Sequence, residues 1–252
     1  AADISRRAHA LSVCCHTTKP DPGSSLETDA SMGQLATLYR ITDANLALRK
    51  EFLRFTSGDV AALAALAPWA RRVAPVIARE FYDHQFAFSE TRAFFEQHAR
   101  RRGIALGRLR EHLEHVQAEY FRQIFEEAAR GGGFGTDYFE RRLHVGALHN
   151  EIDLPLKWYI GSYALYHDLV RAHLHRGRLL LRPDLRTRVE RALFCVFIYD
   201  MQAIVEAYYF DTFRAMGVRL AAVAVDNARH DLSDHGAALK QQVGRAVGEL
   251  VR

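Results

Sequence analysis

Residues 149–163 read HNEIDLPLKWYIGSY and place a histidine where one predicted helix gives way to the next. Pro155 fixes φ and has no N–H, so one helix must end near Asp153, a candidate cap, and another must begin there. His149 then lies in the last turn of the first helix. The residues that share its helical face are apolar, and they are Tyr138, Val145, Leu148 and Ile152. The spacing therefore predicts that the imidazole points into the interior.

A histidine in this position has two interpretations. A neutral imidazole on an apolar wall can bind iron through one nitrogen while a backbone or side-chain acceptor orients the other nitrogen. The alternative is a core histidine whose ring simply has its hydrogen bonds satisfied, and periodicity alone favours this one. The residues leave both open.

The composition predicts one soluble domain with appendages. The chain has 252 residues, of which 49% are hydrophobic and 25% charged. The formal charge of +4 is scattered, so we expect no nucleic-acid partner. No window approaches the roughly 18 consecutive apolar residues of a membrane span, so we expect no membrane partner. The cysteines Cys14, Cys15 and Cys195 are too few and badly placed for a disulfide framework, which predicts a cytoplasmic protein.

Nearly everything from Ile41 onward has the apolar spacing of helices, and no segment alternates as a strand would. The pattern predicts an all-α domain. The expected helices are roughly Asp43 to Arg54, Asp59 to Leu66, Trp69 to Ala87, Glu90 to Arg100, Leu106 to Ala129, Asp137 to Glu151, Pro155 to Arg176 and Pro183 to Met216. Gly131 to Gly135 should form a loop or hinge, because a phosphate-binding loop needs a Gly-Lys-Ser/Thr ending and a preceding strand.

The chain divides into three parts. Residues 1–36 show no period and are expected to form a mobile tail. Residues 37–218 form the globular domain. Residues 219–252 carry apolar residues at heptad spacing, among them Val225, Leu232 and Leu239, which is typical of the start of a coiled coil.

Two further residues are candidates for a binding pocket. Tyr82 has apolar neighbours, and a phenol in such a setting needs a partner for its hydroxyl, although most buried tyrosines are simply core. His112 lies at the border of an apolar stripe on the helix that follows. It fits a solvent edge and a pocket equally well.

A resemblance to a known family bears on these alternatives. The set His149, Ile152, Leu154, Pro155, Trp158 and Tyr159 resembles the signature of the globin-coupled sensors and their protoglobin relatives. Phe81-Tyr82-Asp83 is similar to that family's distal-pocket helix, and residues 109–121 resemble its helix over the distal face of the haem. The likeness covers roughly residues 41–217. One departure is that Asp153 stands where the family usually carries glycine.

The resemblance implies a globin-like helical bundle with an extra N-terminal helix, and haem b as cofactor. It makes His149 the proximal haem-iron ligand and Tyr82 the hydrogen-bond donor to O₂. His112 lies on the helix that resembles the family's distal helix, at a position where relatives commonly carry a smaller or apolar residue, and an imidazole there is a candidate distal ligand. The residues expected to contact the haem are Phe81, Leu109, His112, Leu113, Val116, Val145, Leu148, His149, Ile152, Trp158 and Tyr159.

The resemblance also implies a homodimer through helices 155–176 and 183–216. The second of these helices carries a long apolar stripe, which is Leu193, Val196, Phe197, Met201, Ile204, Tyr208 and Phe213. The stripe could equally be core, and in the family such helices form a four-helix interface between subunits.

Three functions follow from these observations. The first, not an enzyme, is a haem-based O₂ or other diatomic gas sensor that signals through the dimer to an effector domain C-terminal to residue 252. The second is a free-standing haem protein that carries out redox chemistry on O₂, nitric oxide or peroxide. The third is a helical dimerisation module without haem. The heptads after Gly217 favour the first.

Overall fold

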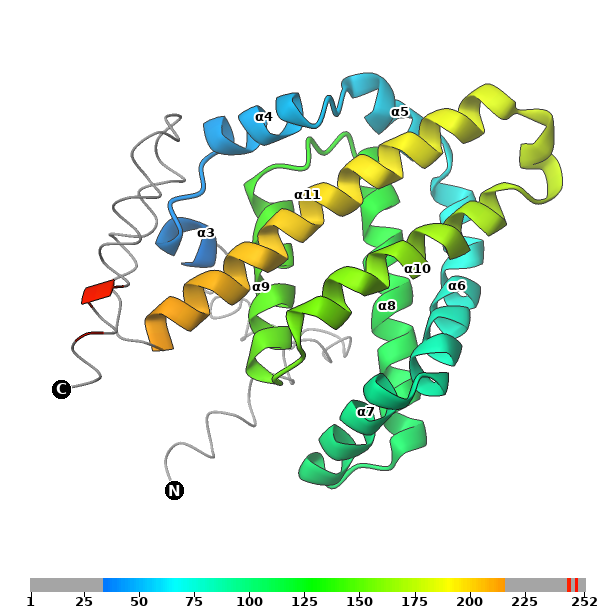
Figure 1. The fold of residues 1–252 in the computed structure, drawn as a ribbon. Coiled ribbons are helices and arrows are strands. Elements are labelled where there is room, and N and C mark those ends of the chain that lie inside the picture. The colour runs from blue at the N-terminus through cyan, green and yellow to red at the C-terminus, as the bar shows by residue number, and fades with distance from the viewer. Residues whose placement is uncertain (1–33, 216–243, 246–247, 249–252) are drawn as a thin grey trace, which may run out of the picture.

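The helix α11 (Pro183–Ala215) runs along the whole bundle, and several of the other elements pack directly against it (Figure 1). The computed structural model describes residues 34–215, 244–245 and 248. The other helices between residues 34 and 215 are α3 (Gln34–Leu38), α4 (Asp43–Phe52), α5 (Ser57–Ala65), α6 (Ala67–Ala87), α7 (Ser89–Arg102), α8 (Leu106–Ala129), α9 (Thr136–Glu151) and α10 (Leu156–Leu174). A 3₁₀ turn, η1 (Gly177–Leu181), joins α10 to α11. The described chain contains no strand, which confirms the all-α prediction.

The helix ends follow local chemistry, and they explain small departures from the predicted ranges. The α8 helix spans the residues expected, whereas α5 begins at Ser57 and not at Asp59. Thr56 caps α5, because its hydroxyl accepts from the N–H of Asp59 while the Asp59 carboxylate accepts the Thr56 N–H at 2.8 Å. Asp59 is therefore the third residue of the helix and completes its capping box.

The short helix α3 docks on α9 through one carboxylate. Glu140 is buried, and it accepts the backbone N–H of Leu35 at 3.0 Å and that of Ala36 at 2.6 Å. The boundary expected at residue 37 thus falls inside a docked helix. The tail of residues 1–33 and the heptads after Gly217 lie outside the described residues, apart from residues 244–245 and 248.

The packing is arranged in two pairs. The α6 helix packs on α8, and α9 packs on α11, while α5 touches both α8 and α11. In Figure 1 α10 runs beside α11, and it also contacts α6. The loop between α8 and α9 is anchored at its centre, because Phe134 is fully buried and the Tyr199 hydroxyl donates to its carbonyl at 2.8 Å.

The apolar stripe predicted on α11 turns out to be core. Six of its seven residues are buried within this single chain, and only Met201 is half-buried. A different set faces outward along the same helix, spaced by three or four residues: Phe194, Ile198, Met201, Val205 and Tyr209. Phe194 is 53% exposed and Tyr209 is 41% exposed.

α11 also has the length and apolar composition of a membrane span. Within its most apolar 18-residue window 61% of the residues are buried in the bundle, as in the core helix of a soluble protein. The helices α5 and α6 also pass this test of length and composition when taken together, with a bend of 71° between them. The absence of a membrane partner and the cytoplasmic location remain predictions from the sequence.

Candidate functional site

His149 is half-buried in the last turn of α9, with one ring nitrogen engaged and one open. Nδ1 lies 2.7 Å from the carbonyl oxygen of Val145, and because a carbonyl can only accept, Nδ1 carries the proton. Among the described residues nothing hydrogen-bonds to Nε2. Burial lowers the pKa of His149, while the bond to Val145 acts in the opposite direction. The ring is thus a neutral imidazole with a free lone pair on Nε2, which is the form that binds metals.

The turn after His149 is a Schellman motif. The N–H of Leu154 donates to the His149 carbonyl at 3.0 Å, and the N–H of Asp153 donates to Asn150 at 3.0 Å. Asp153 adopts a left-handed conformation with φ of 61°, which glycine adopts at less cost. Asp153 thus ends α9. Its position in the sequence had suggested a cap for α10, but Pro155 occupies the N-cap of that helix.

Two contacts with α11 hold this end of α9 in place. Gly146, one turn before His149, lies so close to α11 that a Cβ built on it would be 2.7 Å from the Cβ of Ala207 and 2.9 Å from the Cα of Ile204. Beyond the turn, the Tyr208 hydroxyl donates to the carbonyl of Leu154 at 2.8 Å. The imidazole is therefore positioned by the crossing of α9 and α11.

The adjacent aromatic residues at the start of α10 have different partners. The ring of Tyr159 meets the ring of His149 edge-on, with centroids 4.8 Å apart. Trp158 packs on Phe88, at the end of α6, with centroids 5.3 Å apart. Both are half-buried. Only Tyr159 contacts the histidine directly.

Tyr82, on α6, lies in an aromatic cluster. Its ring is 5.2 Å from that of Phe81, 6.1 Å from that of Phe95 and 6.3 Å from that of Phe86. Burial first, and then the Glu114 carboxylate, raises the pKa of Tyr82, so the phenol keeps its proton. Within the described part of the chain no group hydrogen-bonds to its hydroxyl. A buried phenol with an unused donor is suited to a polar ligand.

The other residues expected to line the pocket fall into two groups. Phe81 and Leu109 are buried, and Phe81 packs on Tyr166 of α10, which makes it part of the core. The remainder are half-buried, with apolar surface that the described protein does not fully cover: Leu113, Val116, Val145, Leu148 and Ile152. His112 is also half-buried, on α8, whereas His115 is exposed.

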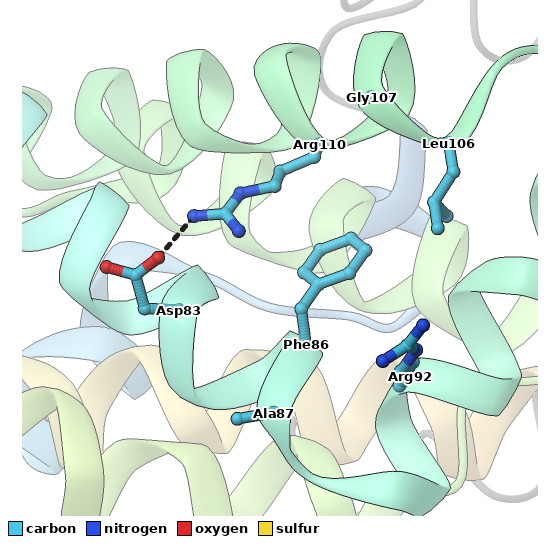
Figure 2. Close-up of a pocket in the computed structure, with 7 residues that line it drawn as sticks. All are labelled: Asp83, Phe86, Ala87, Arg92, Leu106, Gly107 and Arg110. Atoms are coloured by element: carbon cyan, nitrogen blue, oxygen red, sulfur yellow. Dashed lines mark hydrogen bonds and ion pairs between the residues drawn. The ribbon is translucent and has the colours of Figure 1, made fainter.

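A hollow of about 390 Å³ opens beside the Tyr82 cluster, where α6, α7 and α8 meet (Figure 2). Its wall carries an ion pair between Arg110 and Asp83 at 2.5 Å, and the guanidinium of Arg110 lies 5.4 Å above the ring of Phe86. Arg92 lines the opposite side, as Figure 2 shows. This hollow is an open surface feature, and its charges are already paired on the Asp83 side.

Sequence reasoning placed Phe86 near Tyr82 but missed two other residues of this region. The first is Phe95 of α7, which stacks on Phe86 of α6 beside Tyr82, with centroids 5.0 Å apart. The adjacent pair Phe94-Phe95 in an otherwise polar helix was the available signal. The second is Tyr163, whose hydroxyl lies 3.4 Å from that of Tyr159 and 3.3 Å from that of Tyr120. Its position four residues after Tyr159 places both on one helix face.

This donor set and its surroundings fit a haem. One imidazole with its second nitrogen tied to a carbonyl is the usual protein contribution to haem-iron ligation. Half-buried apolar side chains from α8, α9 and α10 provide surface for a flat, mostly apolar macrocycle. In the described region no three His, Cys, Asp or Glu side chains gather as ligands for a bare ion.

The sequence is similar to that of a known haem-based protein. The chain is 27% identical over 133 residues to the haem-based aerotactic transducer HemAT of Halobacterium salinarum. That alignment covers 53% of this chain and 24% of the transducer, so the chain spans about a quarter of its relative.

The fold has a solved counterpart. The globin domain of a Geobacter sulfurreducens globin-coupled sensor superposes with a TM-score of 0.52 at 18% identity, over 64% of this chain and 96% of that domain. The model of the protoglobin family matches residues 42–213, which is more than half of the chain. The chain is therefore a globin-fold protein that belongs to the protoglobin family.

Proposed function

We propose that this chain is a haem-based sensor domain in which His149 holds the iron of haem b. The observation that carries the proposal is the state of the His149 ring, with Nδ1 bound to Val145 and Nε2 open on a half-buried apolar wall. Bound haem supplies an iron centre that takes up a diatomic gas. The HemAT relative, named as a haem-based aerotactic transducer, supports the same class of function.

Tyr82 is the proposed donor to the gas. Tyr82 is a buried residue whose hydroxyl is protonated and unused by the described protein, and a hydrogen bond from it favours a polar ligand such as O₂ over an apolar one. His112 is a competing candidate for the distal side, because an imidazole at this half-buried position of α8 would bind iron directly when no gas is present.

The output of the sensor is proposed to pass through a homodimer of α10 and α11 to a C-terminal effector. The outward stripe on α11 supports this, since the chain itself leaves Phe194 and Tyr209 exposed and covers the three residues between them only in part. Ile160 of α10 is also exposed, at 38%. A gas drives such an output only as far as its affinity differs between two states of the dimer.

The iron ligand is tested by absorption spectroscopy of the purified chain. His149→Gly should lose the haem band, and free imidazole should restore it by filling the space left by the side chain. His115→Gly, on the exposed face of α8, is the control and should keep the native spectrum. Stoichiometric haem with an unchanged spectrum in His149→Gly contradicts the assignment.

The distal side is tested by two variants. Tyr82→Phe removes one hydrogen bond of about 1–3 kcal/mol, so O₂ should dissociate roughly 5- to 150-fold faster. If His112 binds iron at rest, His112→Ala should convert a six-coordinate low-spin spectrum into a high-spin one. An O₂ dissociation rate that Tyr82→Phe leaves unchanged would rule out its role, and identical high-spin spectra would rule out that of His112.

The dimer is tested by sedimentation. Val205→Glu places a charge in the outward stripe and should convert the dimer to a monomer at micromolar concentration. Phe52→Glu is the matched control, because Phe52 is 85% exposed on α4 and does not belong to the outward stripe of α11. A dimer that survives Val205→Glu shows that the contact lies elsewhere.

A further inference from the structure

A buried charged cluster ties α8 and α9 to the middle of α11. The side chains of Arg142 and Asp200 are 2% and 0% exposed, and Nε of Arg142 lies 3.2 Å from Oδ2 of Asp200. The same oxygen accepts the hydroxyl of Tyr120 at 2.6 Å and that of Tyr138 at 3.1 Å. The guanidinium lies 4.0 Å from the centroid of the Tyr120 ring. One carboxylate oxygen of α11 thus gathers donors from two other helices.

Two phenols of α10 continue this cluster toward the histidine. The hydroxyl of Tyr163 lies 3.3 Å from that of Tyr120, and the hydroxyl of Tyr159 lies 3.4 Å from that of Tyr163. The ring of Tyr159 then meets the ring of His149, 4.8 Å away. The contacts form a continuous series from Asp200, on α11, to the imidazole at the end of α9, which we call the contact chain.

The links of this chain differ in strength. The bond from Tyr120 to Asp200 is short and charge-assisted, whereas the two contacts between phenols exceed the usual O–H···O length. A small movement of α10 therefore tightens or breaks the contact chain first at the hydroxyl of Tyr163. The ring of Tyr163 also packs on Phe197, with centroids 5.8 Å apart, so it stays in place without its hydroxyl.

The cluster contributes more to position than to stability. A buried ion pair is usually no more stabilising than apolar residues of the same volume, because both charges lose their hydration. It does, however, fix the directions of its donors, since each must point at one oxygen. Here the donors that it fixes are Tyr120 and Tyr138, and Tyr120 is the next link toward Tyr163.

We propose that Asp200 is a positioning residue for His149, acting through Tyr120, Tyr163 and Tyr159. This rests on the proposed function, in which α11 carries the dimer contact and His149 holds the iron. The contact chain then couples the dimer contact on α11 and His149 in both directions. A shift of α11 changes how Tyr159 supports the imidazole, and a displacement of the imidazole changes the position of α11. Coupling between two sites is reciprocal by necessity.

The test removes hydroxyl groups of the contact chain, one at a time and together, in the full-length, haem-loaded protein. Tyr163→Phe and Tyr120→Phe each remove one link while keeping the ring, and the double variant removes both. Resonance Raman of the ferrous, gas-free protein reports the iron–histidine stretching frequency. We expect each single variant to shift this frequency in the same direction, and the double variant to shift it no further, because links in series fail together.

The anchor and the control use α11 itself. Asp200→Asn combined with Arg142→Gln removes both charges at once, so that neither is left buried alone, and it should shift the frequency in the same direction. Tyr199→Phe is the matched control. Tyr199 is next to Asp200 on α11, and the variant removes its buried hydrogen bond to the carbonyl of Phe134, which is not part of the contact chain. It should leave the frequency unchanged.

A second readout does not need haem. In the haem-free full chain, NMR of labelled histidine follows the ring resonances of His149, which are assigned by their loss in His149→Gln. Tyr163→Phe should shift these resonances, because the Tyr159 ring beside the imidazole loses its anchor. Native frequencies and native His149 resonances in Tyr163→Phe, or additive shifts in the double variant, overturn the proposal. Failure to bind haem overturns the proposed function instead and leaves the NMR test standing.

Discussion

Gly146→Ala should loosen the crossing of α9 and α11 that positions His149. The added Cβ would lie 2.7 Å from the Cβ of Ala207, 2.9 Å from the Cα of Ile204 and 3.0 Å from the oxygen of Ile204. Carbon atoms normally approach to about 3.5–4.0 Å, so the two helices must separate by roughly 1 Å. Two of the three contacts are with backbone atoms, which cannot rotate away.

The magnitude follows from two opposing effects. Overpacking a close contact of this kind costs about 1–3 kcal/mol. Replacing glycine by alanine inside a helix returns about 1 kcal/mol through helix propensity. Because the clash involves backbone, we expect a net loss of about 1–2 kcal/mol in the free energy of unfolding.

The assay is urea denaturation of native protein and variant under the same conditions. If the dependence of the unfolding free energy on urea is unchanged, the unfolding midpoint of Gly146→Ala should fall by roughly 0.3–1 M. Its haem should also dissociate faster, because the displaced part of α9 lies only one turn before His149. The control is Gly107→Ala, at the second position of α8, where a Cβ meets nothing within 4 Å. It should be slightly more stable than the native chain. A Gly146→Ala protein as stable as this control would refute the argument.

Three further outcomes are expected. Asp153→Gly should raise the free energy of unfolding by about 0.5–1 kcal/mol, measured in urea, because it relieves a left-handed residue. Burial raises the pKa of Glu140, but bonds from His144 and from the N–H groups of Ala36 and Leu35 outweigh it, so the folded pKa lies below 4.5. The stabilisation by Glu140 is therefore present above pH 4.5 and lost as the pH falls through its folded pKa, where exchange of these two amide protons should accelerate. Asp200→Asn alone should cost about 3–5 kcal/mol in thermal or urea unfolding, since it leaves the buried guanidinium unpaired.

The sequence by itself determined the helices from α4 onward and the candidate iron ligand. Apolar spacing and breakers such as Pro155 act over a few residues, so they define α8 and the end of α9 without knowledge of the rest of the chain. The same local pattern placed His149 on the inward face of α9 and Tyr82 among aromatic residues. The family match confirms the globin fold that these residues suggested.

Only the tertiary structure decided which face of each long helix meets which neighbour. The middle of α11 carries apolar residues on more than one face, so its sequence does not distinguish the buried face with Ile204 from the outward one with Val205. Nor do the sequence positions of Asp200, Arg142 and Tyr120, which lie on three helices, reveal that they meet. Their contacts depend on how closely and at what angle the helices cross, and that is set by side-chain packing between segments far apart in the chain.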